Sequence, residues 1–148
     1  MDSSNRISFV IRNRIEEAHL VRSSVQAICV EAMIDSKDAF QIASCVIEII
    51  TEAITQSLNN QTDQKIEVDM VVEKDFIRLV FRYGGKEIDP KRIEQLNHLT
   101  SKSNAMETKE LGFYLLKINL DKVEYAFDHG KNIWILEKKV KAYGAPAR

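Results

Sequence analysis

Four polar residues at steps of four lie in one long apolar segment of the chain. The segment EIITEAITQSLNN carries Glu48, Glu52, Gln56 and Asn60 at these positions. Residues four apart in an α-helix lie on one face, with a drift of about 40° at each step. The side chains would therefore form a stripe of acids and amides along an apolar helix. Such a stripe is either the solvated edge of a core helix or one wall of a binding site.

The glycine content argues against a phosphate-binding loop built from glycine. The chain has five glycines in 148 residues, about 3%, against a usual content of about 7%. Gly84 and Gly85 are adjacent, and no glycine lies between Gly85 and Gly112. The adjacent pair is either a plain turn after a strand or part of a ligand site.

The elements that must position these residues follow from the spacing of apolar side chains. We expect a strand over 6–11 and an amphipathic helix over 13–33. A second helix would begin at a cap formed by Asp35 or Ser36, end at about residue 59 or 60, and be buried around most of its circumference. The later elements are predicted from period-two alternation and turn residues: a hairpin over 65–81, a short helix over 90–99, a helix over 111–120, and a closing hairpin formed by VEYAF and NIWILEKKV.

The order β-α-α-β-β-α-α-β-β predicts an α/β two-layer sandwich. We expect a mixed, mainly antiparallel sheet with the helices grouped on one face. A chain of 148 residues matches the size of one domain. We therefore expect a single domain over 1–148, with a core at about 6–140 and a flexible tail over 141–148.

The overall composition is that of an ordinary globular protein. With 21 basic and 22 acidic residues, the net charge of -1 gives no general attraction to nucleic acid or to an anionic membrane. No apolar run approaches the roughly 20 residues of a membrane span, and the N-terminus lacks the pattern of a secretory signal. Cys29 and Cys45 lie among apolar helical residues, which indicates buried free thiols and a reducing, cytoplasmic setting. The spacing of His19, His98 and His129 does not indicate a metal site.

Several stretches of the chain resemble the GHKL ATP-binding fold, the ATPase domain of histidine kinases. They are EAITQ at 52–56, YGGKEIDP at 83–90, ELGFYLLKINLDKVEY at 110–125 and the closing hairpin. Within this fold the chain is most similar to the small bacterial anti-sigma-factor serine kinases, which consist of this domain alone. The resemblance extends from residue 6 to about residue 140.

The first motif of that family is a helix with Glu followed four residues later by Asn. The resemblance implies that Glu52 is the general base and that Gln56 stands where the family has its magnesium ligand, with Asn60 in the third position. Gln56 is one methylene longer than asparagine. Because magnesium demands near-octahedral geometry, we expect this change to weaken the metal site.

The second motif is normally Asp-x-Gly-x-Gly, and here it is altered at two positions. Alignment on Ile88, Asp89 and Pro90 places Tyr83 at the aspartate, Gly85 at the first glycine and Glu87 at the second. In the family the aspartate accepts a hydrogen bond from the adenine amino group. A tyrosine does not reproduce that acceptor geometry, so we expect adenine recognition to be damaged.

The third motif is normally Gly-x-Gly at the start of a helix, where main-chain N–H groups close on phosphate. Here it is Glu110, Leu111 and Gly112, so that one glycine is kept and the other is a carboxylate. In the preceding segment, Ser101 and Lys102 either contact phosphate or form an ordinary polar loop.

Three altered motifs on an intact scaffold lead us to expect a regulator that acts by protein binding, because function follows the site rather than the fold. It would be anti-sigma-factor-like or partner-switching, with lost or weakened ATP binding and no cofactor. One alternative is an active serine kinase that uses ATP and magnesium to phosphorylate an anti-anti-sigma protein. Another is a sensory domain with a different small ligand in the vacated pocket, stacked on Tyr83. The resemblance further implies a homodimer and a protein partner, either a sigma factor or an anti-anti-sigma-like protein, with no nucleic acid or membrane as partner.

Overall fold

The computed structural model describes residues 5–59, 61, 63–98 and 108–141, without the side chains of 108–110. Its elements in chain order are β1 (Asn5–Arg12), α1 (Ile15–Glu31), α2 (Ser36–Glu52), the π-helical turn η1 (Ala53–Ser57), β2 (Lys65–Val72), β3 (Phe76–Tyr83), α3 (Pro90–His98), α4 (Thr108–Asn119), β4 (Lys122–Asp128) and β5 (Lys131–Lys139). The predicted order of strands and helices is confirmed. Asn60, Ser101, Lys102 and residues 142–148 of the expected tail over 141–148 lie outside the described residues. Lys141, the first residue of that tail, is held by backbone contacts to Asp35 and Asp38.

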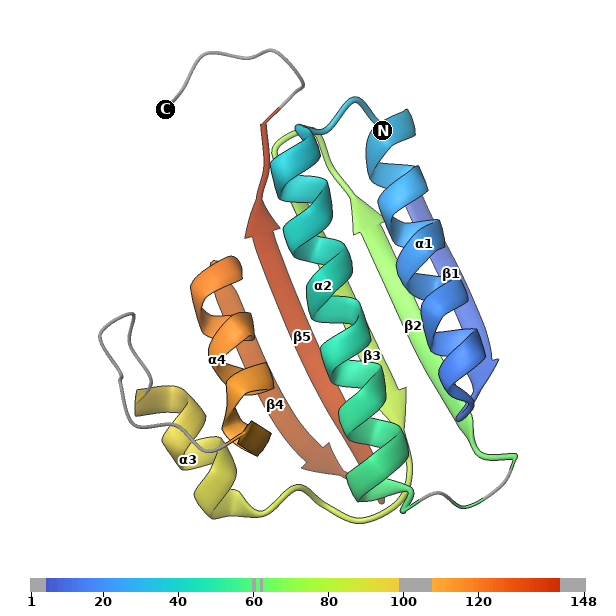
Figure 1. Ribbon diagram of the computed structural model, residues 1–148, viewed down its shortest axis with the longest axis vertical. Coiled ribbons are helices and arrows are strands. Elements are labelled where there is room, and N and C mark those ends of the chain that lie inside the picture. Colours follow the sequence, from blue (N-terminus) through green and yellow to red (C-terminus); the bar gives the residue numbers. More distant parts are fainter. Residues whose placement is uncertain (1–4, 60, 62, 99–107, 142–148) are drawn as a thin grey trace.

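The strands form one five-stranded sheet in the order β1-β2-β3-β5-β4. All neighbouring strands in this sheet pair antiparallel, so the expectation of a mixed sheet is wrong in that respect. Helices α1, α2 and α4 lie on the same face of the sheet (Figure 1). The two-layer α/β sandwich is confirmed.

Helix α2 is the central helix of this layer. It lies between α1 and α4 and contacts both (Figure 1). Its N-terminus is capped by Asp35, whose side chain accepts a hydrogen bond from the Lys37 N–H at 3.3 Å. The core beneath it combines its apolar face with the inward side chains of alternate strand residues, among them Ile42, Ile49, Ile50, Val68, Met70, Leu79, Phe81 and Trp134.

The end of α2 differs from the predicted regular helix. The α-helix stops at Glu52 and continues as η1, in which the Leu58 N–H donates to the Ala53 carbonyl at 2.9 Å. This is the wider i to i+5 turn of a π-helix. At the end of η1 the Ser57 carbonyl accepts a hydrogen bond from the Lys86 N–H at 2.8 Å. This contact joins residues far apart in the chain, so it could not be predicted from the spacing of apolar residues in the helix. The predicted α-helix to residue 59 or 60 is therefore wrong from Ala53 onward.

The predictions for the two cysteines and for the helix over 111–120 are close to the structure. Cys29 and Cys45 are buried free thiols, as expected, and burial raises the pKa of each to about 12. Helix α4 begins at Thr108, earlier than the expected Leu111. Within the described part of the chain, no helix is long and apolar enough to cross a bilayer, and no three of the His, Cys, Asp and Glu residues are grouped so that they could hold a metal ion.

Candidate functional site

The residues of the first two motifs meet where the end of α2 and η1 face α3 and α4. Two small cavities lie there. One of about 150 Å³ is lined by Glu52, Gln56, Ser57, Lys86, Glu87, Ile88, Asp89 and Arg92. The other, of about 240 Å³, is lined by Glu48, Thr51, Glu52, Thr55, Gln56, Arg92, Gly112 and Phe113. Glu52, Gln56 and Arg92 line both cavities and so define the centre of the candidate site.

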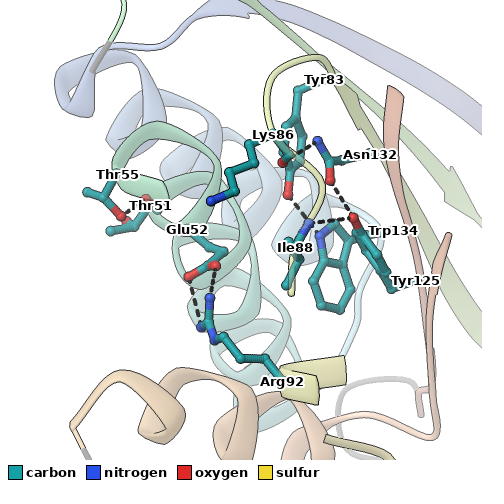
Figure 2. Close-up of polar contacts among 10 residues, drawn as sticks. All are labelled: Thr51, Glu52, Thr55, Tyr83, Lys86, Ile88, Arg92, Tyr125, Asn132 and Trp134. Carbon is teal, nitrogen blue, oxygen red and sulfur yellow. Dashed lines mark hydrogen bonds and ion pairs between the residues drawn. The ribbon is translucent and has the colours of Figure 1, made fainter. Parts of the chain in front are cut away.

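The predicted base, Glu52, is bound by an arginine that the sequence analysis missed. Arg92 Nη1 donates to Glu52 Oε1 at 2.6 Å and Nη2 donates to Oε2 at 3.3 Å (Figure 2). The two side chains are only 15% and 12% exposed. The guanidinium also lies over the Phe113 ring, 4.6 Å from its centroid. Both carboxylate oxygens of Glu52 therefore already bind a cation that belongs to the protein.

Glu48, one turn before Glu52, lies against Gly112. A Cβ atom at Gly112 would stand 2.3 Å from Glu48 Oε2, so a larger residue there would displace the end of the Glu48 side chain. No ion pair of Glu48 occurs among the described residues. Burial raises the pKa of Glu48, and the charge of Glu52 raises it further.

The position of Gly112 also changes its expected role. Because α4 begins at Thr108, Gly112 lies in the second turn of the helix and not at its start. Only the N–H groups of the first turn lack partners within an α-helix. The expectation that Gly112 stands at the start of the helix is therefore wrong, and its described contact is with the Glu48 carboxylate.

Tyr83, which takes the place of the adenine-binding aspartate, is a core residue. It is 1% exposed, and its hydroxyl accepts a hydrogen bond from Trp134 Nε1 at 3.0 Å (Figure 2). Burial raises the pKa of its phenol well above the usual range. The buried ring offers no face to a ligand, so the expectation that Tyr83 stacks on a planar group is wrong in this arrangement.

The loop over residues 84–89 is held in place by a buried asparagine. Asn132 is 0% exposed, and its Nδ2 donates to the Gly84 carbonyl at 3.0 Å and to the Lys86 carbonyl at 3.3 Å. Its Oδ1 accepts a hydrogen bond from the Tyr125 hydroxyl, which in turn accepts from the Ile88 N–H at 3.0 Å (Figure 2). The sequence offered a signal for Asn132, since it shares the inward face of its strand with the apolar Trp134 and Leu136.

Gly85 and Asp89 have structural roles in the same loop. Gly85 has a φ of +84°, and a Cβ atom there would lie 2.3 Å from the Ser57 carbonyl oxygen. Only glycine allows the loop to approach η1 so closely. Asp89 Oδ1 accepts a hydrogen bond from the Lys91 N–H at 2.9 Å at the start of α3, as a helix cap does.

Gln56, the expected metal ligand, is exposed on η1 and lines both cavities. The structure therefore brings it beside Glu52, as predicted. In a regular α-helix, residues four apart such as Glu52 and Gln56 lie one above the other. Here Gln56 lies in the wider π-helical turn, so its side chain is rotated away from that position. Gln56 is next to the base but is not placed by a regular helix.

Several of these residues would conflict with a bound magnesium–ATP complex. The expected general base, Glu52, is already paired with Arg92, the adenine acceptor is replaced by the buried Tyr83, and Gly112 lies inside a helix. The two cavities, of about 150 and 240 Å³, are each smaller than the about 300–1,000 Å³ usual for small-molecule sites. In this arrangement the described residues do not fit the nucleotide and its metal.

The protein family is identified by the sequence as a whole and not by these altered positions. The sheet with its helices on one face is the two-layer α/β sandwich expected from the sequence. A search of curated proteins found no match. The family model described as the histidine kinase-like ATPase domain matches residues 11–137, which is most of the chain. The protein therefore belongs to the histidine kinase-like ATPase domain family, in agreement with the GHKL resemblance.

Proposed function

We propose that this protein is a regulatory member of its family that acts by binding a protein partner, with ATP binding lost or weakened. The observation that carries the proposal is that three positions of the ATP site are engaged in contacts within the chain. Tyr83 is hydrogen-bonded to Trp134, Glu52 is paired with Arg92, and Gly112 is packed on Glu48. The regulator would be anti-sigma-factor-like or partner-switching.

The chemistry of phosphoryl transfer supports this choice over an active serine kinase. Transfer needs a carboxylate that positions the attacking hydroxyl and metal ions that neutralise charge on the phosphates. Here the candidate base forms an ion pair with Arg92 at 2.6 Å. A kinase cycle would have to break this pair before Glu52 could receive a metal or a substrate proton.

Exposed apolar side chains support a protein as the partner. Leu20 and Val30 on α1 are 65% and 57% exposed, Met33 just after α1 is 62% exposed, and Phe40 on α2 is 62% exposed. Large exposed apolar side chains are available for association with another protein. A sigma factor, an anti-anti-sigma-like protein or a second copy of the chain would each satisfy this requirement.

The test is nucleotide binding to the unaltered protein. A ligand at a hundred times its dissociation constant adds about 2.7 kcal/mol to the free energy of unfolding. We expect no change in the thermal midpoint with magnesium–ATP, and a complex with the protein partner that forms in EDTA without nucleotide. Micromolar binding of magnesium–ATP in calorimetry, abolished by Glu52→Ala or Gln56→Ala, would contradict the proposal. Phosphate transfer to a serine of a co-purifying partner would establish the kinase instead.

A further inference from the structure

Glu48 and Glu52 face a cavity rich in oxygen ligands. The cavity of about 240 Å³ is also lined by Thr51, Thr55 and Gln56. Carboxylate, amide and hydroxyl oxygens are the donors that hard divalent cations prefer. The lining therefore has the chemistry of a cation site, yet the cation beside Glu52 in the structure is the guanidinium of Arg92.

The position of Arg92 is not explained by its own helix. It follows Pro90 and Lys91 in the first turn of α3, which contains no acidic residue. The N-terminal end of a helix dipole is positive, so basic residues there are unfavourable. A residue type that is unfavourable in its own helix is expected to be stabilised by contacts with other parts of the fold. The guanidinium of Arg92 contacts the Glu52 carboxylate and the Phe113 ring, and its buried Nε has no hydrogen-bond partner among the described residues.

We propose that Arg92 is a built-in cation that takes the place of a divalent metal at Glu52 and keeps the site free of such metals. This inference deepens the proposed function, on which it rests, because it assigns the loss of the metal to one residue. Gln56, although longer than the asparagine of the family motif, is then not the decisive change.

Electrostatics and geometry support this exclusion. A divalent ion at Glu52 would lie close to the guanidinium, and like charges at such distances repel strongly in a partly buried site. Arg92 also uses both oxygens of the carboxylate. Without its charge, Glu48 and Glu52 would be two neighbouring carboxylates without a counter-ion among the described residues. A divalent cation would relieve that repulsion.

The experiment is titration of the full chain with manganese alone, without nucleotide, followed by the paramagnetic resonance signal of the free ion. The unaltered protein is expected to bind no manganese at Glu52. Arg92→Met is expected to create one site with a dissociation constant of about 10⁻⁴–10⁻³ M, the range of weaker oxygen-ligand sites. This would be at least a tenfold gain over the unaltered protein.

Matched variants separate the charge of Arg92 from general effects. Arg92→Lys keeps the charge and is expected to bind no manganese, and Arg92→Met combined with Glu52→Gln is expected to lose the new site. Arg78→Met removes an Arg–Glu pair on the opposite face of the sheet, where Arg78 Nη2 lies 2.7 Å from Glu137 Oε1, and is expected to gain nothing. If Arg92→Met does not fold, Arg92→Gln replaces it, because a neutral amide can still donate to Glu52.

Three results would overturn the inference. They are folded Arg92→Met and Arg92→Gln proteins that bind no more manganese than the unaltered protein, a new site that survives Glu52→Gln, or a Glu52-dependent manganese site in the unaltered protein. Failure of the proposed function is measured separately, since it depends on magnesium–ATP binding to the unaltered chain.

Discussion

The two halves of the candidate site are held together by different physical means. In the Tyr83 half, formed by Tyr83, Tyr125, Asn132 and Trp134, neutral hydrogen bonds and aromatic packing fill the interior. In the Glu52 half, formed by Glu48, Glu52, Arg92 and Gly112, charged groups border two cavities. Figure 2 shows Glu52 on one side of the loop that carries Lys86 and Ile88, and Asn132 and Trp134 on the other side.

This difference separates two ways in which a fold can lose a ligand. A volume filled by core side chains cannot be reopened without removing part of the core, and close packing makes that costly. A charge neutralised by a single ion pair can be released by one substitution, with the surrounding structure in place. We therefore expect variants in the Tyr83 half to change stability and variants in the Glu52 half to change ion binding.

The largest expected effect comes from restoring the family aspartate, Tyr83→Asp. The change removes a buried aromatic ring, places a carboxylate among core residues and leaves Trp134 Nε1 opposite a misplaced acceptor. Loss of a buried aromatic side chain costs about 3–5 kcal/mol, and an uncompensated charge adds to this. We expect urea denaturation to show a loss of at least about 4 kcal/mol in the free energy of unfolding. A stable Tyr83→Asp protein that gains adenine nucleotide binding would show that the half is an open pocket.

The matched control for this change is Tyr83→Phe. It keeps the ring and removes only the hydroxyl that accepts the hydrogen bond from Trp134 Nε1 at 3.0 Å. An unsatisfied buried donor costs about 1–3 kcal/mol, so the control should lose less than Tyr83→Asp loses. Equal losses in the two variants would assign the effect to the hydrogen bond and not to packing.

A smaller effect is expected at Gly85, where the loop of the Tyr83 half meets η1. In Gly85→Ala the new Cβ combines a left-handed backbone with a 2.3 Å approach to the Ser57 carbonyl oxygen. We expect a loss of about 3 kcal/mol, of which about 1–2 kcal/mol comes from the backbone conformation alone. Gly130→Ala is the control, because Gly130 has a φ of +75° with open space around it, and it should lose only about 1 kcal/mol. Equal losses in thermal denaturation would mean that the loop moves away from η1 at little cost.

The fold could be predicted from the sequence because its signals are local. Alternation along 65–81 and the apolar circumference of the second helix identified the hairpin and the central helix, and both are present. The π-helical turn was not predicted, since its wider turn accompanies a contact between Ser57 and Lys86, far apart in the chain. The spacing of apolar residues predicts which face of a helix is buried, but it does not predict a change from an α-helical to a π-helical turn.

The site could be predicted only where motif residues mark it. Glu52 and Gln56 were identified and do lie together at the cavities. Arg92 was not, because its role depends on a carboxylate 40 residues away in the chain. The burial of Tyr83 was missed because the residue was compared only with the aspartate that the family motif has at this position. In the structure Tyr83 is the next inward-facing residue of β3 after Leu79 and Phe81, and it is buried like them.

The carboxylates of the Glu52 half also differ from those on the opposite face of the sheet. Hydrogen bonds from Arg78 and Lys122 lower the pKa of Glu137, so that its ionised form is stabilised by folding. Burial raises the pKa of Glu48, with a further increase from Glu52, so that its ionised form is disfavoured by folding. Replacement by glutamine should therefore change the free energy of unfolding in opposite directions at the two residues.

The smallest expected effect is a gain in stability at neutral pH from Glu48→Gln. A glutamate whose folded pKa is raised contributes stability that is fully present below its ordinary pKa of 4.5 and is lost as the pH rises through the folded pKa. Glutamine, which does not ionise, removes that loss while keeping the size of the side chain beside Gly112. The gain over the unaltered protein should be present at pH 7 and should disappear as the pH falls below about 4.5. Glu137→Gln is the control: at pH 7 it should lose stability, and the loss should shrink as the pH falls through the lowered pKa of Glu137. Urea denaturation across this pH range measures both, and a loss at pH 7 in Glu48→Gln would mean that the Glu48 carboxylate has a cationic partner.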